Sequence, residues 1–183
     1  MDKDWKRLTD FLLAEGIDRI PHSDKTYLGH LIAVYKDMEA RGCSQELCRA
    51  GMFHSIYGTE RFQGFKLPLE RRPEVRDLIG QRAEWLAYLN CAMDRPAFDR
   101  ALEKNQEPFL YVDRITEEQI KLSGEDFDDV CRIHLYDWLE QVPRSKTWDY
   151  RRAAYRRMVD RLGPVAREAY DRVFAGEGAP ARA

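Results

Sequence analysis

Residues 29–58 read GHLIAVYKDMEARGCSQELCRAGMFHSIYG and carry the clearest structural pattern in the chain. Apolar side chains recur at helical spacing over about 27–41, with Leu31, Tyr35 and Met38 on one stripe. Ser23 or Asp24 is suited to cap this helix. Gly42 ends it, and Ser44 caps a second helix expected to run to about residue 57. The stretch therefore predicts two consecutive helices.

The sequence on both sides continues the helical pattern. Apolar stripes predict further helices over about 4–15, 73–94, 98–102, 126–141, 148–161 and 164–174. The 73–94 helix is expected to bend near Gly80, and Pro143 is expected to end the 126–141 helix. Two β-prone stretches flank a polar turn and predict a small β-hairpin near 109–122. The expected fold is all-α, a helical bundle with this one hairpin.

The same pattern divides the chain into three parts. Residues 1–145 are expected to form the main helical domain, and 146–176 a C-terminal helical hairpin packed on it. Residues 177–183, rich in Gly and Ala, are expected to form a flexible tail. The apolar face of the C-terminal hairpin is a candidate surface for a homodimer.

Length and composition favour one cytoplasmic domain. The chain has 183 residues, of which 44% are hydrophobic and 34% charged, and its net charge is −2. A chain of this size buries enough surface for its own core. Its charge balance does not favour nucleic acid, and its apolar runs are too short to form a signal core or to span a membrane. The four cysteines lack metal-site spacing and are expected to be free thiols. We therefore expect no nucleic-acid or membrane partner and a small-molecule substrate.

Histidine is scarce, yet three of the four histidines are close together in sequence. His22, His30 and His54 span 32 positions (54 − 22). Histidines on two adjacent antiparallel helices, with a carboxylate from a third helix, form a sensible metal site. Such ligands suit iron, manganese, zinc or cobalt. The sequence therefore predicts a divalent metal bound by His30 and His54.

The 29–58 stretch resembles the first two helices of the HD-domain superfamily of metal-dependent phosphohydrolases. There a lone His is followed, about two dozen residues later, by a His-Asp pair; here His30 and His54 are 24 positions apart (54 − 30). More narrowly, HSIYGTERF, with IGQRAEWLAY and DWLEQVPR downstream, is similar to an HD-related bacterial family of unassigned function with the signature H-S-I/V-Y-G-T-E. The resemblance covers most of residues 5–145 and implies that the main domain is HD-like.

The resemblance also implies further site residues. The superfamily takes a later Asp from the end of a following helix, and Asp94 is placed for that role, with His22 as an additional ligand. The paired Asp, which often bridges two metals, is replaced here by Ser55. A hydroxyl is a poor ligand for a divalent cation and cannot bridge two of them. A binuclear centre is therefore not expected.

Four further residues are candidates for catalysis or substrate binding. Glu60 follows His54 beyond a glycine turn and is a candidate general base. Tyr57 could donate a hydrogen bond to the substrate. Arg95, and also Arg61, could bind an anionic group. Two reaction classes stay open: hydrolysis of a phosphorylated or nucleotide-like small molecule, and oxygen-dependent chemistry at non-haem iron.

Other interpretations of these residues also stay open. His54 could be a helix-end histidine bonded to a carbonyl, and Asp94 an ordinary helix terminus. His134 shares a helical face with Val130 and Trp138 and is interpreted as packing. The alternative to an enzyme is a catalytically degenerate HD-like module that binds a small molecule or a partner protein.

Overall fold

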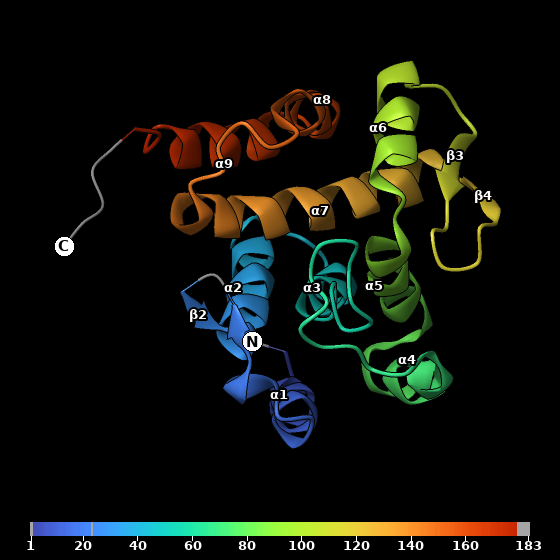
Figure 1. Ribbon diagram of the computed structural model, residues 1–183, viewed down its shortest axis with the longest axis vertical. Helices are drawn as coiled ribbons and strands as arrows, with labels where there is room; N and C mark the ends of the chain where they lie inside the picture. The colour runs from blue at the N-terminus through green and yellow to red at the C-terminus, as the bar shows by residue number, and fades with distance from the viewer. Residues whose placement is uncertain (1, 23, 179–183) are drawn as a thin grey trace.

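The computed structural model describes residues 2–22 and 24–178, and within these ranges the chain is mainly helical (Figure 1). The helices of the described residues are α1 Trp5–Ala14, α2 Tyr27–Ala40, α3 Gln45–Met52, α4 Arg72–Ile79, α5 Gln81–Ala92, α6 Arg95–Lys104, α7 Gly124–Ser145, α8 Arg152–Leu162 and α9 Pro164–Phe174. Two short 3-10 helices, Ile17–Arg19 and Leu69–Arg71, precede α2 and α4.

Two antiparallel strand pairs complete the fold. Strands β3 (Phe109–Val112) and β4 (Gln119–Leu122) pair with Phe109 opposite Leu122, so the hairpin expected near 109–122 is confirmed. The all-α class is confirmed with it. Strands β1 (Pro21–His22) and β2 (Lys25–Thr26) form a second, two-residue pairing that the sequence did not predict.

Helix α7 runs through the middle of the molecule (Figure 1), packed against α2, α3 and α5 on one side and α8 and α9 on the other. The hydroxyl of Ser123 caps it by accepting a hydrogen bond from the backbone N–H of Asp126. Because neighbours cover both sides, polar residues in its central turns are buried together with apolar ones. The predicted end at Pro143 is wrong: a proline in the last turn removes one N–H donor, and the helix continues to Ser145.

The α2–α3 pair confirms the central prediction, with corrections at its ends. Thr26 caps α2; of the two predicted caps, Ser23 lies outside the described residues and Asp24 lies in the β1–β2 turn with a φ of 64°. Ser44 caps α3 as predicted. Helix α3 ends at Met52, earlier than the predicted residue 57, and residues 53–57 form turns. His54 therefore lies just beyond a helix end, close to α2 and α7.

The expected bent helix over 73–94 is two helices in the structure. The chain breaks at Gly80, whose φ of 99° favours glycine over other residues. Helix α5 is buried on almost all sides and packs on α3, α4 and α7. It thus forms the wall of the core opposite α2.

Helices α8 and α9 pack on α7 and on each other. The predicted 148–161 helix begins only at Arg152. Residues 179–183 of the expected tail lie outside the described residues. All four cysteines are free thiols, as expected.

Among the described residues, none of the helices combines the length and apolar character needed to cross a membrane.

Candidate metal centre

Three buried side chains meet where α2, the end of α3 and α7 converge: His30, His54 and Asp137. Nε2 of His30 lies 3.3 Å from Nε2 of His54 and 3.2 Å from Oδ1 of Asp137. The remaining distance, from Nε2 of His54 to Oδ1 of Asp137, is 3.3 Å. The three atoms form a nearly equilateral triangle, and none of the three residues is more than 7% exposed.

The outer nitrogens of both rings are already engaged. Nδ1 of His30 lies 2.5 Å from Oε2 of Glu140, and Nδ1 of His54 lies 2.7 Å from the carbonyl oxygen of Gly51. Both oxygens accept, so each Nδ1 carries the proton it donates. In the neutral rings, each Nε2 therefore presents a lone pair to the centre of the triangle.

Three electron-pair donors that face one point favour a positive charge between them, which a metal ion could supply. Ligand atoms bound about 2.0–2.2 Å from one ion lie roughly 3.3–3.6 Å apart in tetrahedral geometry and roughly 2.8–3.1 Å apart in octahedral geometry. The observed separations of 3.2 to 3.3 Å lie close to the tetrahedral values. Histidines that donate their second N–H to a carboxylate or a carbonyl are also the usual arrangement around protein-bound metals. This group of buried side chains could therefore hold a metal ion.

Charged neighbours hold the acidic residues in place. The carboxylate of Glu140 accepts from Nζ of Lys25 at 2.8 Å and from Nη2 of Arg144 at 2.6 Å. The side-chain amide of Gln141 donates to Oδ1 of Asp137. The ligands are thus oriented by an outer layer of hydrogen bonds, which limits their movement.

The electrostatics of the group keep both acids ionised. Burial alone would raise the pKa of Glu140, but the hydrogen bonds from His30 and Arg144 outweigh it and lower this pKa to about 2. Burial likewise opposes ionisation of Asp137, yet the two histidines hold its pKa well below the usual range. For His30, burial lowers the pKa, and the carboxylates of Asp137 and Glu140 more than reverse this. The pocket is therefore built to hold positive charge.

The structure brings together His30 and His54, as predicted, but not Asp94. The carboxylate of Asp94 caps α6, accepting from the backbone N–H of Ala97 at 2.8 Å. Asp137 supplies the carboxylate of the group instead. The correction has a physical reason: Asp94 precedes an Arg-Pro helix start, where a capping carboxylate satisfies free N–H groups.

The other predicted site residues are spread around the group. The ring centroid of His22 lies 4.4 Å from that of His30, and its ring stacks on Phe62 at 4.8 Å. The hydroxyl of Tyr57 donates to buried Glu84 at 2.9 Å and not to His30, His54 or Asp137. Glu60 is exposed, and its carboxylate lies 3.8 Å from Nε of Arg95. Neither Tyr57 nor Glu60 lines the cleft described next.

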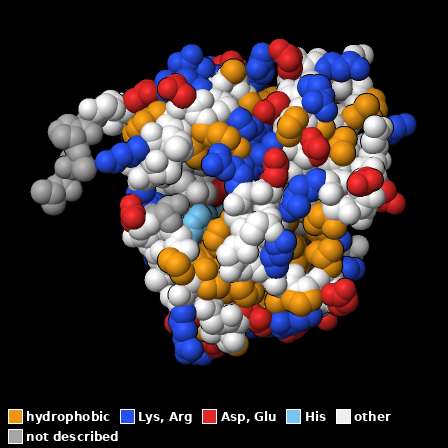
Figure 2. Space-filling view, in the orientation of Figure 1, with side chains coloured by type: hydrophobic (Ala, Val, Ile, Leu, Met, Phe, Trp, Pro, Cys, Tyr) orange, Lys and Arg blue, Asp and Glu red, His pale blue; other side chains and the backbone are white. Residues whose placement is uncertain are grey.

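A cleft of about 370 Å³ opens beside the three ligands. His54 and Asp137 line it, and so do Arg61, Arg95 and Tyr150. His22 and several hydroxyl side chains also contribute to its lining. Figure 2 shows histidine surface in a hollow of one face, with Lys and Arg side chains nearby. The volume of the cleft suits a small molecule.

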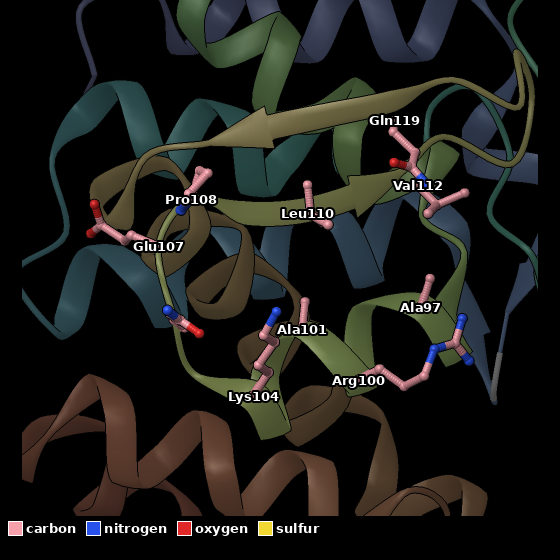
Figure 3. A pocket seen from close by; sticks show the side chains of 10 residues that line it. Ala97, Arg100, Ala101, Lys104, Glu107, Pro108, Leu110, Val112 and Gln119 are labelled. Carbon is pink, nitrogen blue, oxygen red and sulfur yellow. The ribbon is translucent and has the colours of Figure 1, made fainter.

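A second hollow, of about 440 Å³, lies between α6 and β3 (Figure 3). Ala97, Ala101 and Leu110 face it, and Arg100 and Lys104 lie along its edge. It is lined by neither histidine nor cysteine in the described residues, so it offers no comparable metal chemistry.

Sequence reasoning missed Asp137 and Glu140. Their spacing of three places both on one face of α7, as in the D-W-L-E segment of the sequence. The sequence did contain an indication of their role: these acidic residues recur at helical spacing among residues that are otherwise apolar. Acidic side chains on a buried helix face need charged or hydrogen-bonding partners, so such a pattern indicates a polar site inside the core. Tyr150 was also missed; it lies in a turn before α8 and carries no motif.

The fold and the site define an all-α protein with a candidate centre of two histidines and one carboxylate. The model of a family described as a domain of unknown function (DUF6817) matches residues 11–95, somewhat less than half of the chain. The matched segment contains His30 and His54, whereas Asp137 lies beyond it. None of the curated proteins and none of the solved structures matches the chain.

Proposed function

We propose that this protein is an enzyme that uses one divalent metal, bound by His30, His54 and Asp137, to hydrolyse a small molecule. The observation that carries the proposal is the triangle of electron-pair donors, 3.2 to 3.3 Å on each side. Two of its members also line the cleft, so a metal bound there would face the space where a substrate fits.

The donor set fits a catalytic site better than a structural one. Structural zinc sites are closed by four protein ligands, whereas catalytic sites keep a position open. The described residues supply three ligands in one group. A bound divalent ion would supply the remaining chemistry by polarising the substrate and lowering the pKa of a water molecule. Iron, manganese, zinc and cobalt all suit this donor set.

The number of metals is proposed to be one. The residue after His54, Ser55, is buried, and its hydroxyl is hydrogen-bonded to the hydroxyl of Tyr27 at 2.9 Å. It therefore offers no carboxylate to bridge a second ion. The resemblance of residues 29–58 to the HD-domain superfamily supports hydrolysis, and Ser55 in place of the bridging Asp supports one metal rather than two.

A second candidate is oxygen-dependent chemistry at non-haem iron. Two histidines and one carboxylate are the ligand set of many iron(II) oxygenases, and the donors of His30, His54 and Asp137 lie on one side of the site. A third candidate, a module that binds its ligand without catalysis, needs no turnover at all.

One experiment separates these candidates. Metal-stripped protein is reconstituted under argon with Zn²⁺, Mn²⁺ or Fe²⁺ and assayed on phosphate esters and carboxylic esters, before and after admission of air. We expect turnover without oxygen that is lost in D137N and kept in H134Q, a matched change of a buried histidine outside the group. Turnover only with iron and oxygen would replace hydrolysis by oxygenation. No turnover under either condition, with the metal bound, would favour the binding module.

A further inference from the structure

Three arginine side chains lie close to the aromatic ring of Tyr150. The Cζ atom of Arg61 lies 4.4 Å from the centre of this ring, and those of Arg95 and Arg151 lie 5.9 and 6.0 Å away. Nη1 of Arg95 donates a hydrogen bond to the phenolic oxygen at 2.7 Å. These residues come from three separate parts of the chain, so the fold assembles the cluster.

One of the arginines is already neutralised. Arg151 donates from Nε to Oδ2 of Asp99 at 2.9 Å and from Nη2 to Oδ1, a bidentate pair. Its Nη1 faces Nε2 of His134 at 2.6 Å. Arg151 therefore has little hydrogen-bonding capacity left for a ligand.

The other two arginines keep unused binding capacity. Arg61 is exposed and has no carboxylate partner within the described residues. The side chain of Arg95 is only 11% exposed, and its carboxylate neighbour is Glu60, at 3.8 Å and 42% exposed. An ion pair that long and that accessible to water is weak. Two guanidinium groups thus face the cleft with little compensating negative charge.

The positive charge of these arginines lowers the pKa of the Tyr150 phenol. Burial raises the pKa of Tyr150, but the nearby charges and hydrogen bonds of Arg95 and Arg61 bring it below its usual value. A neutral phenol can donate its own proton while it accepts from Arg95. Together, two guanidinium groups and one hydroxyl provide donors of the kind that bind an oxyanion.

We infer that Arg61, Arg95 and Tyr150 form an anion subsite, which binds a phosphate or carboxylate group of the substrate away from the metal ligands. All three residues line the same cleft as His54 and Asp137. A substrate would therefore be held at one end by its charge while its reacting bond faces the metal. The description of the anion as part of the substrate rests on the proposed function; anion binding itself does not.

The test uses the metal-free 183-residue chain, so that an anion cannot bind to a metal. Inorganic phosphate and succinate are titrated separately in a calorimeter into the wild-type chain, R61A, R95A and Y150F. We expect saturable binding of at least one of them, about one per chain. It should weaken about ten- to a hundredfold in R61A and R95A, and about three- to tenfold in Y150F.

R100A is the matched control, because Arg100 lies on the same helix as Arg95 but faces the other hollow (Figure 3). Its affinity should equal that of the wild type. R95A removes a largely buried side chain and could unfold the chain. R61A replaces an exposed side chain and Y150F keeps the aromatic ring, so we expect both of these variants to fold and to test the subsite without R95A. The probe that binds more tightly, phosphate or succinate, shows whether the subsite prefers a phosphate or a carboxylate group.

The outcomes separate the two proposals. Failure of both probes to bind, or binding unchanged in R61A and Y150F, would overturn the subsite whatever the metal result. Binding that depends on these residues would uphold the subsite even in a protein that takes up no metal.

Discussion

The Nδ1 atom of His30 lies 2.5 Å from Oε2 of Glu140 in the buried interior between α2 and α7. This contact fixes the ring so that Nε2, and not Nδ1, faces His54 and Asp137. It spans 110 positions of sequence (140 − 30) and joins the two helices that carry most of the site. Glu140 is thus a positioning residue, which would act on a bound metal through His30.

Replacing this carboxylate by an amide should weaken metal binding while leaving all three ligands in place. E140Q removes the charge that raises the basicity of His30, and changes of this kind typically reduce metal affinity about 10- to 100-fold. Affinity is measured by competition with a chromophoric chelator. E125Q, an exposed change near the start of the same helix, is the control. Equal affinities for E140Q and the wild type would show that His30 needs no such support.

Metal should stabilise the folded chain. Ions that bind the native state at a concentration of about 100 times Kd add about 2.7 kcal/mol. For a chain of this size, this corresponds to a rise in Tm of roughly 5–10 °C. The rise should vanish in D137N, which keeps the size of the side chain and removes its charge. A similar rise in D137N would place the bound metal elsewhere.

The buried His134 should make stability depend on pH. Burial, and then the charges of Arg151 and Arg95, hold its pKa well below the usual value, so the native state does not take up this proton. The unfolded chain does so below about 6.5. Unfolding therefore binds a proton in that range, and stability should fall as pH decreases, by up to about 1.4 kcal/mol per pH unit.

The measurement for His134 is the free energy of unfolding in urea between about pH 7.5 and 5, on metal-free protein. The difference in the free energy of unfolding between the wild type and H134Q should change with pH below about 6.5 and be constant above it. Parallel curves over the whole range would mean that His134 has the same pKa in the folded and unfolded chain.

Removing the charge of Glu60 should tighten anion binding. Glu60 is the carboxylate nearest to the free face of Arg95, and an incoming anion has to compete with it. Because exposed pairs are weak, we expect E60Q to bind its preferred probe only about two- to fivefold more tightly. Calorimetry on metal-free protein measures this, with E103Q as an exposed control. Weaker binding in E60Q would mean that Glu60 helps to hold the ligand.

Much of the fold was readable from the sequence, since helical periodicity and capping residues act locally. The α2–α3 pair with Ser44 as its internal cap and the hairpin at 109–122 were predicted within a few residues. The errors lie where local rules compete: Gly80 breaks a helix that its apolar stripe continues, and α7 runs past Pro143.

The site was readable only in part. His30 and His54 belong to one local helix pair, so their spacing was informative. Asp137 lies 83 positions beyond His54 (137 − 54), and it meets the histidines only because α7 packs across α2 and α3. Periodicity shows which face of a helix is buried but not which helix covers it. Asp94 illustrates the converse, because its D-R-P context is a local capping signal.

The most direct test of the metal centre is the metal content of the wild-type chain and of D137N, purified without chelator or affinity-tag metal and analysed by mass spectrometry. We expect about one transition-metal ion per wild-type chain and little or none in D137N, with both proteins folded. A wild-type chain that holds no metal even after reconstitution, or a D137N variant that holds as much as the wild type, would contradict the assignment of His30, His54 and Asp137 as the ligands.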